Sequence, residues 1–385
     1  MSKNEIKTAV TYISLDSLRE GVGASQVLAY IEKLRVDFNM TLISFEKVTP
    51  TTDDIARLKL KGVNWKPISF GRYGVFGGTQ RFIKLLRLIP KNEVVHARSD
   101  LAAFASLIVN TRYVIWDCRA LLADQRRAIL GWSQFSFKFA LMRFIEFFVA
   151  KRSAKIIVIT KSVVPILMKR YKLNVEKMTH ITTCVDRSRF FTSPLPQGQV
   201  IALISGTLSD AYDFKLMNLI IQELRNQCSL KVIISLGEGH GLNWNQLLYD
   251  EVIRKSYYEM PNVISQSSFG LSIWKKDLGV ALTSVASTKS AEFLSCGRPL
   301  IVNRNQGDIG RIVEEEDVGV ATVGSSEQEI KAYCKSILQT IGSPDIESRC
   351  SSVAERYFDL DQGVTSLANV YHRLEELKFD RKYRY

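Results

Sequence analysis

Lys289 and Glu292 stand three positions apart in the stretch STKSAEFLSCGRPLIV, which covers residues 287–302. The stretch begins with hydroxyl residues suited to a helix N-cap and closes with a Gly-Arg-Pro turn, so we expect a short helix between them. On that helix the two charged side chains would be neighbours. An exposed ion pair contributes only about 0.5 kcal/mol. A carboxylate and an ammonium at a helix start can instead bind hydroxyl and phosphate groups of a ligand.

Two further pairs of polar residues stand where predicted strands end. His96 and Arg98 end one strand, and Asp117 and Arg119 end the next. Open α/β sheets bind ligands at the carboxyl ends of their strands. His96 could therefore bind a ligand or donate a proton, or it could simply be hydrogen-bonded to local backbone. Asp117 and Arg119 could face a cleft, or they could form a buried salt bridge that holds their loop.

The segment DSLREGVGASQVLAYI places Gly21 and Gly23 between a predicted strand and a helix. Glycines allow a tight turn there, and the helix N-terminus offers free N–H groups to an anion. Gln26 breaks the GxGxxG pattern of dinucleotide sites, so the segment could equally be an ordinary turn.

Short β-type runs alternate with helical patterns along the chain, which favours parallel sheets covered by helices on both faces. The runs in the first half are 8–15, 40–46, 94–98, 113–119 and 155–160. The runs in the second half are 200–206, 230–237, 270–274, 299–303 and 319–323.

A segment with two prolines and a glycine at 192–199 separates the two series of strands, as a linker would. We therefore expect an α/β fold with two Rossmann-like domains that face each other across a cleft. The expected segments are an N-terminal domain at 1–191, a C-terminal domain at 192–365, and a C-terminal helix with a basic tail at 366–385 that crosses back to the first domain.

Charge is distributed unevenly between the two halves. The net charge of +13 divides into +17 for residues 1–190 and −4 for residues 191–385. A basic half suits anionic lipid, nucleic acid or a phosphorylated substrate; the alternative is a role in solubility alone. Six cysteines without a CxxC pair argue against a zinc site or a disulfide framework. We see no signal peptide and no membrane span, and we expect a cytoplasmic location.

Two segments of the basic half could lie at a membrane surface. Residues 70–91 contain four glycines in a predicted mobile loop, followed by a basic amphipathic helix with Arg81, Lys84 and Arg87. Residues 131–151 contain one tryptophan and six phenylalanines, interrupted by Lys138, Arg143 and Glu146. These charges exclude a comfortable bilayer span, so the second segment either docks on the inner face of the cell membrane or forms a core helix.

Several motifs occur in the order found in one family. STKSAEFLSCGRPLIV is similar to the pattern S-P-x-K-x-x-E-(Y/F)-L-x-C-G-x-P, and VVHARS, DCRALLADQ, SAKIIVIT, TTCVDRSRF and ALISGTLSDAYDF match further motifs. Over roughly residues 8–375 the chain resembles the retaining GT-B glycosyltransferases of the family-4 type. The resemblance implies transfer of a hexose from a UDP- or GDP-linked sugar, with retention of configuration and without a metal or cofactor. The acceptor would be a lipid-linked or surface-polysaccharide intermediate.

The resemblance also implies roles for particular residues. Glu292 would bind the donor ribose and, with His96 and Arg98, belong to the catalytic centre. The other expected donor-binding residues are Gly23, Gly206, Thr207, Lys215, Ser284, Ser287 and Lys289. The expected acceptor-side residues are Ser25, Asp117 and Arg119.

The chain departs from the family pattern in ways that leave alternatives open. Ser284 stands where many members carry a first glutamate, and Thr288 replaces a proline. An inactive family member is therefore one alternative. A nucleotide-sugar 2-epimerase of the same shape is another, and it would rely on His96 and His240. A nucleic-acid binder is disfavoured, because no nucleic-acid-binding motif is present. The only D-x-D, at 359–361, is expected to cap a helix and not to bind a metal.

Overall fold

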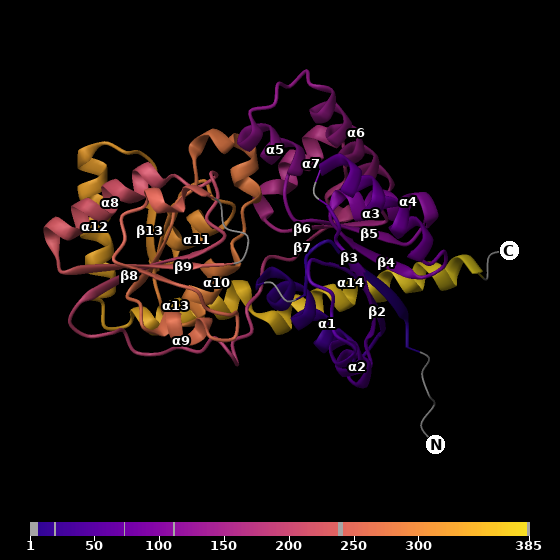
Figure 1. Ribbon diagram of the computed structural model, residues 1–385, viewed down its shortest axis with the longest axis horizontal. Coiled ribbons are helices and arrows are strands. Elements are labelled where there is room, and N and C mark those ends of the chain that lie inside the picture. The colour runs from indigo at the N-terminus through magenta and orange to yellow at the C-terminus, as the bar shows by residue number, and fades with distance from the viewer. Residues whose placement is uncertain (1–6, 19–20, 73, 111, 238–241, 383–385) are drawn as a thin grey trace.

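The computed structural model describes residues 7–18, 21–72, 74–110, 112–237 and 242–382. Within these residues the chain forms a seven-stranded sheet with strand order β3-β2-β1-β4-β5-β6-β7 and a six-stranded sheet with order β10-β9-β8-β11-β12-β13. Every pairing between these described strands is parallel. Figure 1 shows the two sheets side by side, each between layers of helices. The expected pair of Rossmann-like domains is confirmed.

The first sheet follows the predicted rhythm closely. Its strands are β1 (Ala9–Ser14), β2 (Asn39–Glu46), β3 (Asn64–Ser69), β4 (Val94–Arg98), β5 (Val114–Cys118), β6 (Lys155–Val158) and β7 (Met178–His180). All residues of β4 and β5 are buried, as expected for central strands covered on both faces. The sequence did not predict the edge strands β3 and β7. Pro67 lies within β3, and a proline lowers the expectation of a strand except at an edge.

The second sheet consists of β8 (Val200–Gly206), β9 (Leu230–Leu236), β10 (Glu251–Ile253), β11 (Phe269–Ser272), β12 (Leu300–Asn303) and β13 (Gly319–Thr322). Its helices are α8 (Phe214–Gln227), α9 (Met260–Ser265), the 3-10 segment η5 (Lys276–Ser284), α10 (Thr288–Ser295), α11 (Ile309–Glu315), α12 (Glu327–Ile341) and α13 (Ile346–Phe358).

The helices of the first domain begin with a π-helical turn, η1 (Gly23–Leu28), which continues into α1 (Ala29–Leu34). They continue with α2 (Thr52–Leu60), α3 (Gly74–Leu88), α4 (Asp100–Val109), α5 (Leu122–Leu130), α6 (Phe137–Arg152), the 3-10 turn η2 (Lys161–Val163) and α7 (Val164–Tyr171). The expectation of a glycine-rich loop before a helix near residue 81 is wrong, since α3 already begins at Gly74. A Cβ on Gly77 would lie 1.6 Å from the Arg72 carbonyl oxygen, so this glycine permits a close backbone contact.

The chain crosses between the domains at two adjacent points. Cys184 packs in the core of the first domain and Val185 in that of the second. On the return, Phe358 belongs to the second core and Leu360 to the first. A bridge between Val185 and Asp359 joins the two crossings. We therefore propose domain boundaries at these positions, close to the linker and helix start expected from the sequence.

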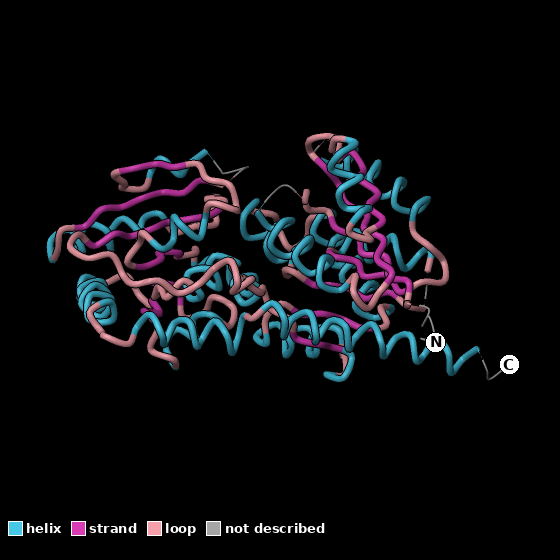
Figure 2. Tube along the Cα trace, turned by 90° about the horizontal axis from the view of Figure 1, so that it is seen from below, coloured by secondary structure: helices cyan, strands magenta, loops and turns pink. Residues whose placement is uncertain are grey.

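Helix α14 (Leu360–Lys382) crosses back to the first domain, as expected. Leu367, Val370, Tyr371 and Leu374 are buried in the core of the first domain. Figure 2 shows the long helix running beneath that domain. The Gln362 N–H donates to Asp359 Oδ1 (3.0 Å), so the expected helix cap at the D-x-D is confirmed.

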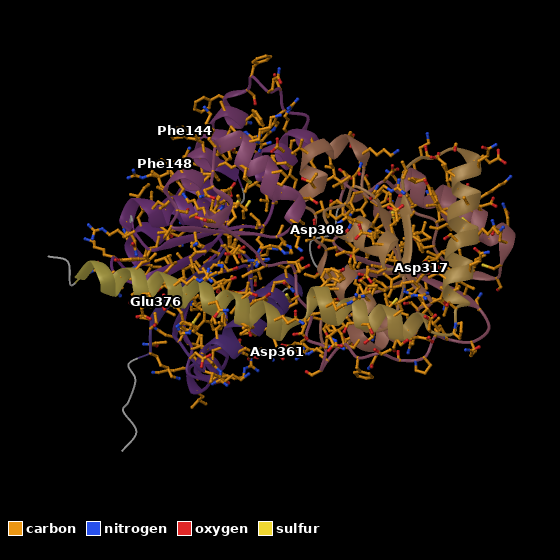
Figure 3. The ribbon with its side chains drawn as sticks, turned by 180° about the vertical axis from the view of Figure 1, so that it is seen from behind. Phe144, Phe148, Asp308, Asp317, Asp361 and Glu376 are labelled. Carbon is orange, nitrogen blue, oxygen red and sulfur yellow. The ribbon has the colours of Figure 1, made fainter. Side chains whose placement is uncertain are left out.

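The two domains are fastened directly to each other near the crossing. Asp308, at the start of α11, accepts hydrogen bonds from the N–H groups of Lys161 (2.6 Å) and Ser162 (3.1 Å). It thereby caps the start of η2 from the other domain. Figure 3 shows Asp308 between the two domains. Thr160 Oγ1 adds a bond to the Thr283 carbonyl oxygen (2.7 Å).

Within the described residues, no helix combines the length and apolarity needed to cross a bilayer.

Candidate functional site

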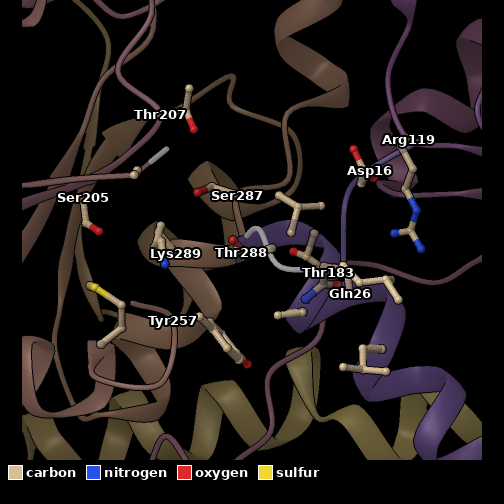
Figure 4. A pocket seen from close by; sticks show the side chains of 18 of the residues that line it. Asp16, Gln26, Arg119, Thr183, Ser205, Thr207, Tyr257, Ser287, Thr288 and Lys289 are labelled. Carbon is tan, nitrogen blue, oxygen red and sulfur yellow. The ribbon is translucent and has the colours of Figure 1, made fainter. Parts of the chain in front are cut away.

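A cavity of about 860 Å³ lies between the two domains and is lined by residues of both. Figure 4 shows Asp16 and Arg119 of the first domain across the cavity from Ser205 and Lys289 of the second. The cavity also reaches Arg57 of α2, Lys61 directly after that helix, and Trp65 of β3. The strands that end beside it include β8 and β9, whose following residues form part of the wall.

The N-terminus of α10 forms the centre of the second-domain wall. Ser287, Thr288 and Lys289 all line the cavity. Ser287 is the N-cap residue, and its side chain makes no capping hydrogen bond within the described chain. The start of the helix therefore lies at the cavity without a side-chain cap from Ser287, and the free N–H groups and dipole of such a helix start favour an anion.

Lys289 and Glu292 form the predicted pair on this helix. Lys289 Nζ lies 2.7 Å from Glu292 Oε2. Glu292 is only 2% exposed and lies behind Lys289, whose side chain is at the cavity surface. Burial raises the pKa of the Glu292 carboxyl, while Lys289 opposes this change. The structure thus places Glu292 where it can hold Lys289, and not where it contacts a ligand directly.

The turn after β8 lies beside Lys289. Ser205, Gly206 and Thr207 line the cavity, as expected for Gly206 and Thr207. Gly206 has a φ of 129°, a conformation that residues with a side chain rarely adopt. A Cβ at Gly206 would lie 4.0 Å from Lys289 Cγ, so the turn and the lysine stem are close neighbours.

A network of buried charges around Asp117 forms the first-domain wall. Asp117 is fully buried. Its carboxylate lies 2.8 Å from Arg119 Nε, 3.1 Å from His96 Nε2 and 3.6 Å from Arg98 Nη1. Arg98 also donates from Nε to Asp16 Oδ2 (3.0 Å). Burial alone would raise the pKa of Asp117, but Arg119, His96 and Arg98 together hold it well below its usual range.

Asp16, Arg98 and Arg119 are the members of this network that reach the cavity. His96 lies deeper, with Nδ1 2.8 Å from the Tyr371 hydroxyl and its ring stacked on Tyr12 at 4.2 Å. Burial lowers the pKa of His96. The expectation that His96 contacts a ligand or donates a proton to it does not fit this placement, because the ring is 1% exposed. Its two nitrogens are already occupied by side chains.

Gly23 and Ser25 lie behind the cavity surface, which their neighbours Gly21 and Val22 line. A Cβ on Gly23 would lie 1.9 Å from the Ser17 carbonyl oxygen, so the helix start packs directly on the loop after β1. Ser25 Oγ donates to the Gly21 carbonyl oxygen (2.5 Å). Both residues shape the wall from within, which differs from the ligand contacts expected of them.

The loop after β1 is held in turn by a buried acid that the sequence analysis missed. Glu46 is 2% exposed. It accepts hydrogen bonds from Ser17 Oγ (2.5 Å), Ser44 Oγ (2.5 Å) and the Leu18 N–H (3.2 Å).

Of the two expected donor-binding residues Lys215 and Ser284, only Ser284 lines the cavity. Lys215 is exposed in the first turn of α8, away from the described cavity lining, so the structure does not support donor contact by this residue. Ser284 does line the cavity. Its Oγ accepts from the Leu121 N–H of the other domain (3.1 Å) and donates to the Ala281 carbonyl oxygen (2.8 Å).

The second-domain wall also has an aromatic part that the sequence did not predict. Tyr212 and Trp274 both line the cavity, and their rings stack with centroids 4.4 Å apart. Asn303 fixes the Trp274 backbone by accepting from its N–H (2.7 Å) and donating to its carbonyl oxygen (2.9 Å). Tyr257 lines the same wall, and burial and the charge of Glu292 raise its pKa. No local sequence pattern predicts these residues, because segments far apart in the sequence bring them together.

His240, the second histidine expected of an epimerase, lies outside the described residues. Within the described chain, no three His, Cys, Asp or Glu side chains gather as a metal site would require.

Comparison with known proteins finds no matching family model and no matching curated protein. Solved structures match along nearly the whole chain. HepE from Anabaena, solved with UDP and glucose, has 13% identity and a TM-score of 0.64, with 94% of this chain and 98% of HepE covered. WaaG, a glycosyltransferase involved in lipopolysaccharide biosynthesis, has 10% identity and a TM-score of 0.65, with 94% and 99% covered.

A Listeria monocytogenes structure assigned as a UDP-N-acetylglucosamine 2-epimerase also matches, at 12% identity and a TM-score of 0.59, with 96% of this chain and 97% of that chain covered. At these identities the likeness establishes the GT-B fold. Because glycosyltransferases and an epimerase share that fold, it does not by itself choose an activity.

Proposed function

We propose that this chain is a glycosyltransferase that moves a sugar from a nucleotide-sugar to an acceptor bound between its domains. The observation that carries this proposal is the interdomain cavity, in which the open end of α10 and Lys289 face Arg98 and Arg119. Its volume of about 860 Å³ falls in the range usual for small-molecule sites. The motif resemblance described above and the UDP and glucose found in HepE support a nucleotide-sugar as donor.

The donor diphosphate would lie at the N-terminus of α10, beside Lys289 and the turn at Gly206. In the transfer, the acceptor hydroxyl oxygen forms a bond to the anomeric carbon, and the bond from that carbon to the diphosphate oxygen breaks. The hydroxyl proton leaves with the nucleoside diphosphate. Preorganised N–H groups and an ammonium stabilise the charge that develops on the leaving oxygen. Glu292 would act by positioning Lys289.

Arg98 and Arg119 would meet the acceptor on the opposite wall. We propose a hexose as the transferred sugar, retention of configuration, no requirement for a metal, and a lipid-linked or surface-polysaccharide intermediate as acceptor. The motif resemblance supports the first three points. The involvement of WaaG in lipopolysaccharide biosynthesis supports the last.

The epimerase alternative is weaker. It was expected to use His96 at the sugar, and the structure buries that ring between Asp117 and Tyr371. Product analysis separates the two activities: a transferase releases nucleoside diphosphate and glycosylates an acceptor, whereas an epimerase returns an isomeric nucleotide-sugar.

The proposal is tested by screening UDP- and GDP-sugars for a donor that raises the melting temperature, as a ligand of the native state must. The donor found is then used in a transfer assay that detects nucleoside diphosphate. Lys289→Met should lower the transfer rate by about 10²–10³-fold, as removal of a transition-state donor does. Lys331→Met, in an exposed helical ion pair with Glu327 (2.6 Å), should leave it unchanged. Equal rates in the two variants, or no stabilising donor, would refute the proposal.

A further inference from the structure

The hairpin of α5 and α6 carries large apolar side chains on its outer surface. We define the α5–α6 patch as Ile129, Leu130, Phe135, Phe137, Leu141 and Phe144. Phe135 is 86% exposed, Phe137 78% and Phe144 56%. A cluster of this kind on a protein surface marks a site of interaction.

The patch is the outer face of a two-faced helix. Phe137, Leu141 and Phe144 follow one another at spacings of four and three on α6, so they share one side. On the inner side, Phe148 packs edge-on against Phe104 of α4 at 5.4 Å. Figure 3 shows Phe144 and Phe148 on the part of the first domain remote from the second. The sequence left open whether this segment is a core helix or a surface helix. The inner face of α6 packs in the core, and its outer face is exposed.

The charge around the patch is positive. Five exposed cations flank it, and none has an ion-pair partner within the described chain: Arg126, Arg127, Lys138, Lys151 and Arg152. The single acidic residue of segment 125–152 is Glu146, which is 1% exposed and bound by Arg143 (2.9 Å) and Arg170 (3.0 Å). The patch thus joins exposed phenylalanines to uncompensated positive charge.

We propose that the α5–α6 patch docks on the surface of an anionic lipid bilayer. Aromatic side chains enter the interfacial region while arginine and lysine contact the charged head groups. A second copy of this chain would be a poor occupant, because a two-fold contact places the same patch on both sides and would set five cations against five. Nucleic acid would match the charge but leave the protruding phenylalanines without an apolar partner.

The patch is continuous with the proposed active site through α5. Gln125 lines the cavity, and the next two residues, Arg126 and Arg127, are exposed at the patch. A bilayer at the patch would therefore lie next to the first-domain wall, where the acceptor is expected. This consequence for the acceptor rests on the proposed function, whereas docking itself does not.

The test measures co-sedimentation with vesicles of phosphatidylcholine alone and with added phosphatidylglycerol, without donor or acceptor. The unaltered protein should bind only the anionic vesicles, and salt should weaken binding. Phe135→Ser combined with Phe137→Ser should lower the partition coefficient by about tenfold, and Arg126→Glu with Arg127→Glu by at least as much. The first double variant removes aromatic anchors and the second reverses charge, so the two contributions are measured separately.

The matched controls lie on the other domain: Phe191→Ser, at a 61% exposed phenylalanine, and Lys331→Glu on α12 should bind as the unaltered protein does. Circular dichroism and melting temperature verify that all variants are folded. Three outcomes overturn the proposal: equal binding of patch and control variants, a dimer in light scattering that the phenylalanine variant dissociates, or binding to duplex DNA in place of vesicles.

The vesicles contain no glycan, so a failure of sugar transfer cannot mimic a loss of docking. Conversely, the patch variants should retain full donor-dependent thermal stabilisation. Docking without any donor binding would leave this proposal intact and refute the proposed function instead.

Discussion

Both walls of the cavity pair a buried carboxylate with a cation, but the number of cations around the carboxylate differs. Each wall contains a buried carboxylate that holds a cation at the cavity surface: Asp117 holds Arg119 at 2.8 Å, and Glu292 holds Lys289 at 2.7 Å. Asp117 is surrounded by two guanidiniums and His96, whereas Glu292 has one ammonium. Their pKa values consequently move in opposite directions: that of Asp117 is lowered and that of Glu292 is raised.

This difference predicts how each wall responds when its buried carboxylate is neutralised. A carboxylate with excess cations is essential to the fold around it, because its loss leaves buried positive charge. A carboxylate whose burial outweighs its single partner is less costly to neutralise. We therefore expect loss of the carboxylate in the first-domain wall to lower the stability of the protein. Loss of the carboxylate in the second-domain wall should instead weaken ligand binding.

The largest effect is expected at the first-domain wall. Asp117→Asn leaves Arg98 and Arg119 without their buried counter-charge and should lower the free energy of unfolding by about 3–5 kcal/mol. Urea unfolding measures it. Asp361→Asn is the control, because its carboxylate pairs with Lys33 at 2.5 Å but is 74% exposed, and such pairs contribute at most about 1 kcal/mol. Similar losses in both variants would contradict the distinction between the walls.

A substitution in the second-domain wall should change the affinity for the nucleotide-sugar. Glu292→Gln keeps the shape of the side chain but removes the charge that holds Lys289, so affinity for the stabilising nucleotide-sugar should fall about tenfold, a loss of about 1.4 kcal/mol. Stability should change little, since an unfavourable buried charge is removed. Calorimetric titration measures the affinity. Glu327→Gln in the exposed pair with Lys331 should have no effect, and unchanged affinity in Glu292→Gln would show that Lys289 does not need this support.

The pH dependence of stability should separate the walls further. The pKa of Glu292 is raised, so its contribution is fully present below about pH 4.5 and is lost as pH rises through the folded value. The pKa of Asp117 is lowered, so its contribution is present above about pH 3.8 and is lost as pH falls through the folded value.

Urea unfolding between pH 3 and pH 8 should therefore show two opposite trends in the free energy of unfolding, one from each carboxylate. As pH rises, the free energy of unfolding of Glu292→Gln should increase relative to that of the unaltered protein. As pH falls, Asp117→Asn should lose less free energy of unfolding than the unaltered protein does. Parallel trends in the two variants would mean that the carboxylates do not differ in the way proposed.

The sequence anticipated the second-domain wall better than the first. The spacing of Lys289 and Glu292, with a hydroxyl N-cap before them, is a local helical signal, and α10 forms there. The roles of His96 and Asp117 depend on Tyr371 and Arg119, and Tyr371 comes from a helix 275 positions away. Strand ends predicted that polar residues gather, but no local pattern says which of them a distant helix will bury.

Tyr212 and Trp274 were missed for a related reason. Their stacking depends on a backbone bridge between two segments that the sequence gives no reason to pair. The central strands were predictable because buried parallel strands are continuous apolar runs, whereas the edge strands β3, β7 and β10 lack that pattern.

The smallest effect is expected where the walls meet. Ser284→Ala removes the acceptor for the Leu121 N–H across the domain boundary (3.1 Å) and should lower the free energy of unfolding by about 1 kcal/mol. Ser265→Ala is a matched control, because Ser265 Oγ donates to a carbonyl three residues earlier (2.8 Å), as Ser284 Oγ does, but within one domain. Equal losses would assign the effect of Ser284 to its local bond. A larger loss for Ser284→Ala, with weaker donor binding, would show that this hydroxyl holds the two walls at their working distance.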